Sequence, residues 1–306
     1  MTPHILVTGS HRSGTTWVGK VLATAPKTRY LLEPFNVAHP NPYVPVCMKH
    51  WYTWLDSDSG TPEKQAFQEV LSFHMRYPRI ENAHPKQLAK RLRDRLRDRL
   101  HAWSGYRVIL KDPIALLSTA WLARNFGIVP VVCIRHPAAF VSSLQLKRWV
   151  FDFHSFLDQP GLIDEFWPNQ HSQIRDLSER QNGDFISEAA YLWRLLHQVI
   201  AKFRRDYPKW IYVRHEDLSR QPVDGFRRLY ADLQLPYADA TDVYLKSTIS
   251  REDQSYVLSS TGVEDVTRDS LANVKVWKKR LSESEVARIR EITGEVGATF
   301  YPDSEW

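Results

Sequence analysis

A short apolar stretch, a glycine-containing loop and a helical segment follow one another directly near the start of the chain. Residues 4–8 predict a strand, and residues 14–25 predict a helix. Gly9 and Gly14 lie between them, where they allow the backbone to curl so that successive amide N–H groups point inward. The helix adds the positive end of its dipole to this loop. The arrangement predicts a phosphate-binding loop at the edge of an α/β sheet.

The loop has the glycine spacing of an NTP-binding Walker loop but a different charge pattern. A Walker loop carries Lys directly after its second glycine, whereas here that position is Thr15 and the basic residue, Arg12, lies inside the loop. A nucleotide with one 5′-phosphate and a sulfate has less charge than a triphosphate, so amides, two hydroxyls and one guanidinium can hold it without a metal. The loop therefore favours a phosphosulfate over ATP, with a chance Gly/Ser/Thr turn as the structural alternative. His11 could contact the ligand, cap the helix or face solvent.

A second basic position follows a later strand. Residues 129–134 are fully apolar, Arg135 comes directly after them, and Ser143 lies eight residues further on, in a predicted helix at 137–148. Ligands of open α/β sheets bind at the carboxyl ends of the strands. An Arg at this edge and a hydroxyl two turns into the next helix can hold a second phosphate from two sides. A surface Arg and a Ser on a helix face are each common alone, but their pairing downstream of the loop indicates a site.

Strand-length apolar runs alternate with helix-length amphipathic segments through much of the chain. Further strands are predicted at 28–32, 106–110 and 210–214, and further helices at 115–126, 186–206, 223–233 and 283–297, the last opening with a capping box at Ser282–Glu285. The alternation predicts an α/β fold, a P-loop-like parallel sheet of about five strands flanked by helices on both faces. One domain, 1–306, is expected because no linker or repeat interrupts the pattern. Two irregular insertions, 36–85 and 149–185, are expected to form an acceptor cleft and its lid.

Residues 12–17, Arg-Ser-Gly-Thr-Thr-Trp, resemble the 5′-phosphosulfate loop of the sulfotransferases that use 3′-phosphoadenosine-5′-phosphosulfate (PAPS). Arg135 and Ser143 resemble the 3′-phosphate motif of the same family. The resemblance implies that PAPS is the co-substrate, that it leaves as 3′,5′-ADP (PAP), and that no metal is required. It implies nucleotide binding by Arg12, Ser13, Gly14, Thr15, Thr16, Trp17, Arg135, Ser143, Arg268 and Lys275. Arg12 would contact the sulfuryl oxygens, residues 13–16 the 5′-phosphate and Trp17 the region of the adenine. The last two residues match a C-terminal region that closes over the nucleotide, although the family's Arg-Lys-Gly triplet is absent.

Sulfuryl transfer needs a base for the acceptor proton and cations for the leaving phosphate. The cytosolic branch of the family uses a His, but the corresponding stretch here, 109–114, contains none. Glu33, at the end of the second predicted strand, resembles the Glu base of the carbohydrate- and tyrosine-modifying branches. Glu33 is therefore expected to be the general base, with Asp112 as the alternative and Lys111 stabilising the leaving group. A turn-capping carboxylate and a solvated Lys are the structural alternatives.

The net charge of +6 and the pI near 9.2 favour anionic ligands, from nucleotides to acidic membrane surfaces. The only cysteines are Cys47 and Cys133, and Cys133 is expected to be a buried thiol. Neither a disulfide framework nor a metal site is expected, because two cysteines are too few and no His has ligand spacing. No signal peptide or membrane span is recognised, so a cytoplasmic location is expected.

Residues 86–101 predict a strongly basic helix. Leu88, Leu92, Leu96 and Leu100 recur at every fourth position, among seven Lys and Arg and only two Asp. A solvated surface helix docked by its leucines is one interpretation. Contact with an anionic acceptor or an acidic membrane surface is the other.

The sequence thus predicts a PAPS-dependent sulfotransferase that modifies a hydroxyl or amine, on a glycan, glycolipid or other small metabolite. Aromatic residues that could stack on acceptor rings, or simply pack, are Trp51, Trp54, Phe151, Phe153 and Trp167. A P-loop kinase or NTPase is the first alternative, and a non-catalytic binder of nucleic acid or acidic membranes is the second. No nucleic-acid partner is expected, and the oligomeric state, including a homo-oligomer, is left open.

Overall fold

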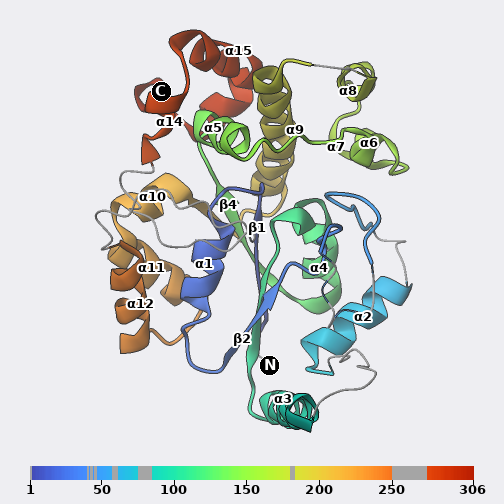
Figure 1. Cartoon of the computed structure of the whole chain (residues 1–306), viewed down its shortest axis with the longest axis vertical. Coiled ribbons are helices and arrows are strands. Elements are labelled where there is room, and N and C mark those ends of the chain that lie inside the picture. Colours follow the sequence, from blue (N-terminus) through green and yellow to red (C-terminus); the bar gives the residue numbers. More distant parts are fainter. Residues whose placement is uncertain are drawn as a thin grey trace.

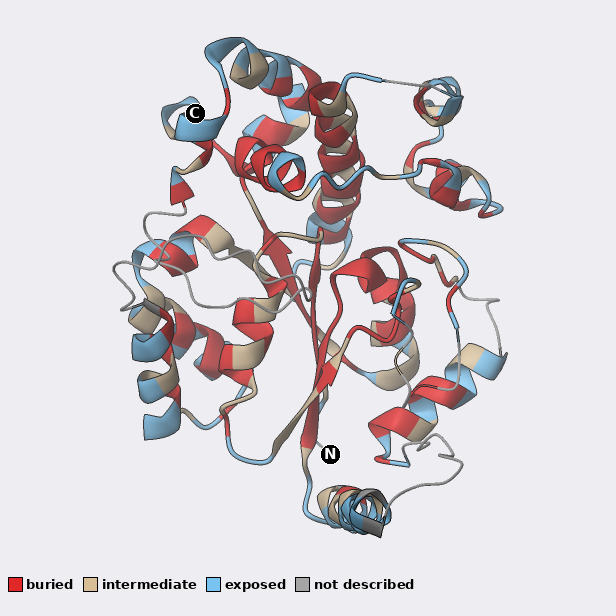
Figure 2. Cartoon of the chain, in the orientation of Figure 1, coloured by how far each residue is buried: buried red, intermediate tan, exposed pale blue. Residues whose placement is uncertain are grey.

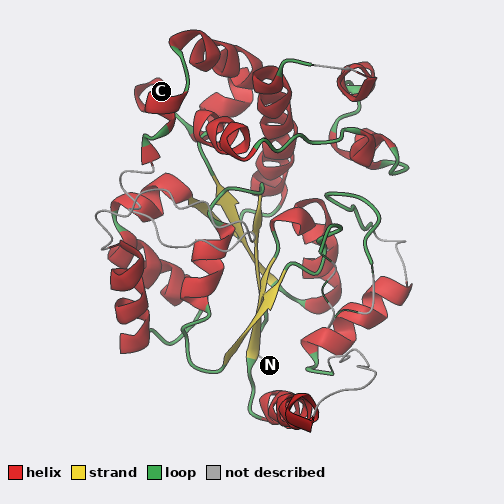
Figure 3. Cartoon of the chain, viewed as in Figure 1, coloured by secondary structure: helices red, strands yellow, loops and turns green. Residues whose placement is uncertain are grey.

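A five-stranded parallel sheet lies at the centre of the protein (Figures 1 and 3). The computed structural model describes residues 2–39, 41, 44, 47–56, 61–74, 85–179, 183–249 and 274–306. The strands are β1 (Ile5–Gly9), β2 (Thr28–Leu32), β3 (Arg107–Lys111), β4 (Val129–Ile134) and β5 (Ile211–Arg214), in the order β2-β3-β1-β4-β5. All pairs are parallel. The predicted α/β class and all five predicted strands are confirmed, with ends that differ by at most one residue.

Side chains on successive strand positions enter two different cores. Leu6 packs into one core, whereas its neighbours Ile5 and Val7 pack into the other. Successive residues of a strand point to opposite faces, so the continuous apolar runs of these strands require cover on both sides. Helices α1 (Thr15–Leu22), α11 (Pro222–Asp232) and α12 (Asp239–Ile249) supply the cover on one face. Helices α4 (Thr119–Phe126), α5 (Pro137–Lys147) and α9 (Phe185–Asp206) supply it on the other. Figure 2 shows the resulting buried strands between more exposed helices.

The helices follow the predicted alternation but add short elements. They are α1 (Thr15–Leu22), α2 (Thr61–Leu71), α3 (Pro85–Trp103), α4 (Thr119–Phe126), α5 (Pro137–Lys147), α6 (His154–Leu157), α7 (Leu162–Phe166), α8 (His171–Glu179), α9 (Phe185–Asp206), α10 (His215–Arg220), α11 (Pro222–Asp232), α12 (Asp239–Ile249), α14 (Trp277–Arg280) and α15 (Glu283–Phe300), with 3₁₀ helices at Pro113–Ser118 and Asp303–Glu305. The segment predicted as irregular, 149–185, therefore contains three short helices, α6, α7 and α8. The predicted helix 115–126 is a 3₁₀ turn followed by α4. The predicted capping box of α15 is confirmed, because Ser282 and Glu285 each bond the other's backbone N–H.

The leucines of α3 do not dock this helix. Leu88, Leu92, Leu96 and Leu100 are all exposed, and Asp98, on the opposite side of the helix, is buried. The expectation of a helix held by its leucines is therefore wrong. The helix is basic and exposed as predicted, but its apolar face points to solvent.

The β1–β4 pairing brings Gly9 against Cys133 at the point where the loop begins. Gly9 has φ +141°, and a Cβ atom there would lie 2.2 Å from the Cys133 carbonyl oxygen. The position therefore excludes any side chain for two reasons, the backbone conformation and the space. Cys133 itself is a buried free thiol, as predicted.

A comparison of Gly9→Ala with Gly127→Ala should separate the effect of the backbone conformation from the effect of the steric clash. Gly127 also has a positive φ, +61°, but a Cβ there would meet nothing within 4 Å. We expect Gly127→Ala to lower the free energy of unfolding by about 1 kcal/mol, from the backbone conformation. Gly9→Ala should lower it by about 3 kcal/mol or more, because a clash is added. Denaturant unfolding measures both, and equal losses would contradict the clash.

A second prediction concerns His197, which is fully buried in α9 and stacks on Trp193. Burial lowers the pKa of His197 to about 3, so the folded protein keeps this ring neutral while the unfolded chain protonates it below about pH 6.5. Protonation of His197 in the unfolded chain does not lower the free energy of unfolding above pH 6.5. Below that pH it lowers the free energy of unfolding progressively, until the pH reaches about 3. His197→Gln should therefore reduce the slope of unfolding free energy against pH by about 1.4 kcal/mol per unit between pH 4 and 6. Parallel slopes for the two proteins would contradict this.

Candidate active site

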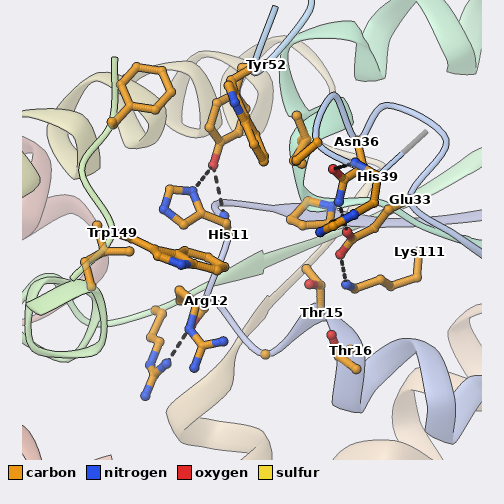
Figure 4. Close-up of a pocket in the computed structure, with 18 of the residues that line it drawn as sticks. His11, Arg12, Thr15, Thr16, Glu33, Asn36, His39, Tyr52, Lys111 and Trp149 are labelled. Atoms are coloured by element: carbon orange, nitrogen blue, oxygen red, sulfur yellow. Dashed lines mark hydrogen bonds and ion pairs between the residues drawn. The ribbon is translucent and has the colours of Figure 1, made fainter. Parts of the chain in front are cut away.

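The carboxyl ends of all five strands contribute to one pocket. β1 leads into the loop with Arg12, β2 is followed by Glu33, β3 ends at Lys111, β4 is followed by Arg135, and β5 is followed by His215; each of these residues lines the pocket. Because the strands are parallel and in register, their ends lie at one edge of the sheet. The cavity there has a volume of about 480 Å³. Figure 4 shows His11, Arg12 and Trp149 on one side of it and Glu33, Asn36, Lys111, Thr15 and Thr16 on the other.

The anion loop presents five of the ten predicted nucleotide-binding residues to this cavity. The pocket lining includes Arg12, Gly14, Thr15, Thr16 and Trp17. Ser13 differs, because it is buried and its hydroxyl donates to the Ser10 carbonyl, 2.5 Å away. The Ser13 side chain thus closes the turn, and the loop offers backbone N–H groups at the start of α1, as an anion site requires.

The two predicted phosphate signatures meet in the fold. Arg12 Nε donates to Ser143 Oγ at 2.9 Å, although the two residues are 131 positions apart. Arg135 donates from Nη1 to the Arg12 carbonyl oxygen at 2.6 Å. The Arg135 carbonyl in turn accepts a bond from Trp193 Nε1. The structure therefore places two guanidinium groups and a hydroxyl together beside the anion loop. Charged donors of this kind bind phosphate and sulfate oxygens strongly.

Glu33 and Lys111 form an ion pair inside the pocket. Both side chains are nearly buried, and Asn36 Nδ2 donates to the other carboxylate oxygen of Glu33 at 2.7 Å. Glu33 also has a positive φ of 42°, a conformation that is rare for a residue with a side chain and is concentrated at functional sites. Its backbone N–H donates to the Lys111 carbonyl oxygen at 2.8 Å. The carboxylate is thus fixed by its backbone, by Lys111 and by Asn36.

Asp112, the alternative base, is occupied by backbone donors. One of its oxygens accepts from the N–H groups of Ile114 and Ala115, and the other accepts from the N–H of Phe35. Burial and the nearby Glu33 raise the pKa of Asp112 to about 7, and these N–H donors oppose the rise. The side chain is fully buried and does not line the cavity. Its role here is to cap the 3₁₀ helix and to hold the chain after Glu33.

His11 is held as a neutral ring by Tyr52. The backbone N–H of His11 donates to Tyr52 Oη at 2.9 Å, and this oxygen lies 2.5 Å from His11 Nδ1. Since Oη accepts the backbone bond, its own proton is available to Nδ1, which places the ring proton on Nε2. Burial, with Arg12 nearby, lowers the pKa of His11 to about 3. The residue therefore adds no charge to the pocket that it lines.

Several residues of the cavity carry no recognisable motif in the sequence. Tyr52, Asn36, Trp149 and His215 line it. His215 is close to the loop, since a Cβ on Gly14 would lie 2.5 Å from its Nδ1. His215 belongs to the segment 213–218, in which the buried Glu216 accepts from the His136 N–H and the Tyr301 hydroxyl. Only the position of His215 at a strand end could have indicated it beforehand.

Some of the remaining predicted residues line the cavity and others do not. Among the aromatic candidates, Trp51 and Phe151 line the cavity, whereas Trp54, Phe153 and Trp167 do not. Trp167 is buried and donates to the Leu195 carbonyl. Lys275 is exposed and is not part of the described lining. Arg268 lies outside the described residues.

No cluster of three or more potential metal ligands occurs in the part of the chain that the structure describes. The described lining of the pocket supplies guanidinium, ammonium, hydroxyl and backbone N–H groups. These groups suit an anionic ligand that reacts beside a carboxylate.

Residues 3–239 match the profile of the sulfotransferase family. Among curated proteins, no sequence matches this chain significantly. Similar solved structures include a sulfotransferase domain from the curacin biosynthetic pathway (14% identity, TM-score 0.48, 95% of this chain and 97% of that chain). Others are sulfotransferase STF9 from Mycobacterium avium (18%, 0.45, 98% and 76%) and mouse sulfotransferase SULT7A1 complexed with PAP (13%, 0.45, 100% and 86%). The family match covers well over half of the sequence and includes both phosphate signatures, and the chain therefore belongs to the sulfotransferase family.

Proposed function

We propose that this sulfotransferase takes its sulfuryl group from PAPS and transfers it to an acceptor hydroxyl or amine, releasing PAP. The observation that carries the proposal is the contact between the two phosphate signatures, Arg12 to Ser143 and Arg135 to the Arg12 backbone. The anion loop suits the 5′-phosphosulfate, and Arg135 with Ser143 suits the 3′-phosphate. A ligand with phosphate groups on both the 5′ and the 3′ position of a ribose would use both sets of donors.

The reaction is an in-line displacement at sulfur. The acceptor oxygen or nitrogen forms a bond to sulfur, and the bond between sulfur and the bridging phosphate oxygen breaks. The acceptor proton passes to a base, and the electron pair of the broken bond remains on the phosphate of PAP. The site must therefore provide a base on the acceptor side and positive charge on the leaving side.

Glu33 is the proposed base, and Lys111 and Arg12 are the proposed sources of positive charge. Glu33 lines the cavity with a carboxylate that is already oriented by Lys111 and Asn36. Lys111 is fixed next to Glu33 and lines the same cavity, so its ammonium can also reach the sulfuryl group as negative charge passes to the leaving phosphate. Arg12 faces the same cavity from the loop and lies over the Trp149 ring, 5.7 Å from its centre. Fixed groups of this kind need little rearrangement when charge develops.

The proposed acceptor is a hydroxyl of a glycan, a glycolipid or another small metabolite. Trp51, Trp149 and Phe151 also line the cavity. Aromatic faces can pack against the apolar face of a sugar ring or against an alkyl chain. A screen of sugars, lipids, phenols and peptides with labelled PAPS would identify the acceptor class.

PAP should stabilise the protein without magnesium. A ligand that binds only the folded state adds about 2.7 kcal/mol at a concentration of 100 times its Kd, which appears as a rise in Tm. Arg135→Ala should weaken PAP binding by about 2–3 kcal/mol, the range for hydrogen bonds to charged groups. Calorimetry should compare the affinity for PAP with the affinity for ATP in the presence of magnesium. Tighter binding of ATP would instead favour a kinase or NTPase. No Tm shift at saturating PAP would contradict the proposal.

Glu33→Gln should lower turnover by about 100-fold or more, as expected for loss of a general base, while PAP binding is retained. Glu179→Gln is the matched control, since Glu179 is exposed at the end of α8 and should leave turnover unchanged. Transfer of labelled sulfuryl group to the acceptor found in the screen measures both variants. Full activity of Glu33→Gln would assign the base to another residue.

A further inference from the structure

Helix α3 exposes apolar side chains and packs against the protein with polar ones. On its inner side, Asp98 is buried and lies 3.7 Å from Arg29 of β2. One turn further on, His101 stacks on Tyr106 at 3.8 Å between ring centres and contacts Phe73 edge-on. A surface helix of a globular protein normally has the reverse arrangement. The outward apolar face therefore needs a partner that lies outside the described part of the chain.

The outward face is a continuous apolar stripe. The exposed fractions of its side chains are 53% for Leu88, 62% for Leu92, 51% for Leu96, 64% for Leu100 and 95% for Trp103. Residues four apart are successive neighbours along one helix face, and Trp103 falls on this face because it follows Leu92 by about three turns. At 1.5 Å per residue the stripe is about 22 Å long. Apart from the rim of the active-site pocket, this is the main group of exposed large apolar residues among those described.

The same helix has a large excess of positive over negative side chains. Pro85–Trp103 contains seven Lys and Arg against two Asp, a net charge of +5, whereas the whole chain has +6. Arg93 and Arg99 are exposed on either side of the leucine stripe. If the α3 helices of two chains packed face to face, their two highly positive surfaces would lie side by side. Repulsion between like charges disfavours a second copy of the chain as the partner.

We propose that α3 binds the surface of anionic lipid bilayers, lying parallel to the membrane with its leucine stripe inserted. A helix with Leu and Trp on one face, Lys and Arg beside them and low net hydrophobicity is the type that binds at the lipid–water interface. The long basic side chains can reach the headgroups while their stems follow the apolar surface, and Trp favours the interface. An acidic protein partner would satisfy the charges but would not require a straight row of leucines with Trp at its end.

The place of α3 in the fold separates this surface from catalysis. α3 leads into the amino end of β3, and the active-site pocket lies at the carboxyl ends of the strands. Figure 1 shows α3 at one extremity of the molecule, beyond the amino ends of the strands, and Figure 2 shows its outer side exposed. No described helix could itself cross a bilayer. Bound in this way, the protein would hold its pocket on the side away from the lipid.

Co-sedimentation of the full chain with vesicles tests the proposal. Vesicles of phosphatidylglycerol and phosphatidylcholine should bind the protein at least tenfold more tightly than vesicles of phosphatidylcholine alone, because basic residues near the surface are attracted to anionic lipid. The double substitution Leu92→Ser with Leu96→Ser should weaken this binding at least tenfold. Arg93→Glu with Arg99→Glu should do the same, and both variants should keep the Tm of the original chain.

Matched controls lie elsewhere on the protein. Val243→Ser removes an exposed apolar side chain from α12, and Lys209→Glu with Arg228→Glu makes the same change in net charge at exposed positions away from α3. Both should change vesicle binding by less than about twofold. Equal binding to the two kinds of vesicle, or to neither, would overturn the proposal. Loss of binding only in the charge variant would indicate a soluble polyanion instead, and self-association abolished by the leucine substitutions would indicate a second copy.

Discussion

The parallel alignment of five strands is the constraint on which the site depends. Parallel pairing brings every carboxyl end to the same edge, so residues as far apart in the sequence as Arg12 and His215 line one cavity. β1 lies in the middle of the sheet, between β3 and β4. The anion loop that follows it is therefore flanked by Lys111 on one side and Arg135 on the other. The positions of both cations follow from strand order.

At this edge of the sheet, contacts within the protein hold the charged groups of the pocket in place. The Glu33–Lys111 pair is almost fully buried, and a buried ion pair of this kind contributes less to stability than its short contact suggests because both groups lose hydration. Its benefit is orientation, which Asn36 and the unusual backbone of Glu33 reinforce. Neutral His11, held by Tyr52, shapes the loop without adding a charge that would compete with Arg12.

The net positive charge of the chain is concentrated away from the pocket. A net charge of +6 suggested an anionic ligand, but +5 of it belongs to α3, at the end of the molecule opposite the pocket. In the pocket, Arg12 and Arg135 are fixed by directed hydrogen bonds, and Glu33 is paired with Lys111. The net charge of the chain is thus mainly a property of the surface formed by α3, whereas the pocket is characterised by directed hydrogen bonds.

The sequence by itself determined the fold class, the five strands and the glycine-containing loop between β1 and α1. Local patterns carry this information, because strand periodicity and glycine spacing each depend on residues close together in the chain. The tertiary structure decided what depends on contacts between distant segments. It bound Tyr52 to His11, brought His215 beside Gly14, occupied Asp112 with backbone donors from two segments, and turned the leucines of α3 outward. A helical repeat shows that an apolar face exists, but only the packing of Asp98 and His101 against their neighbours fixes the direction in which that face points.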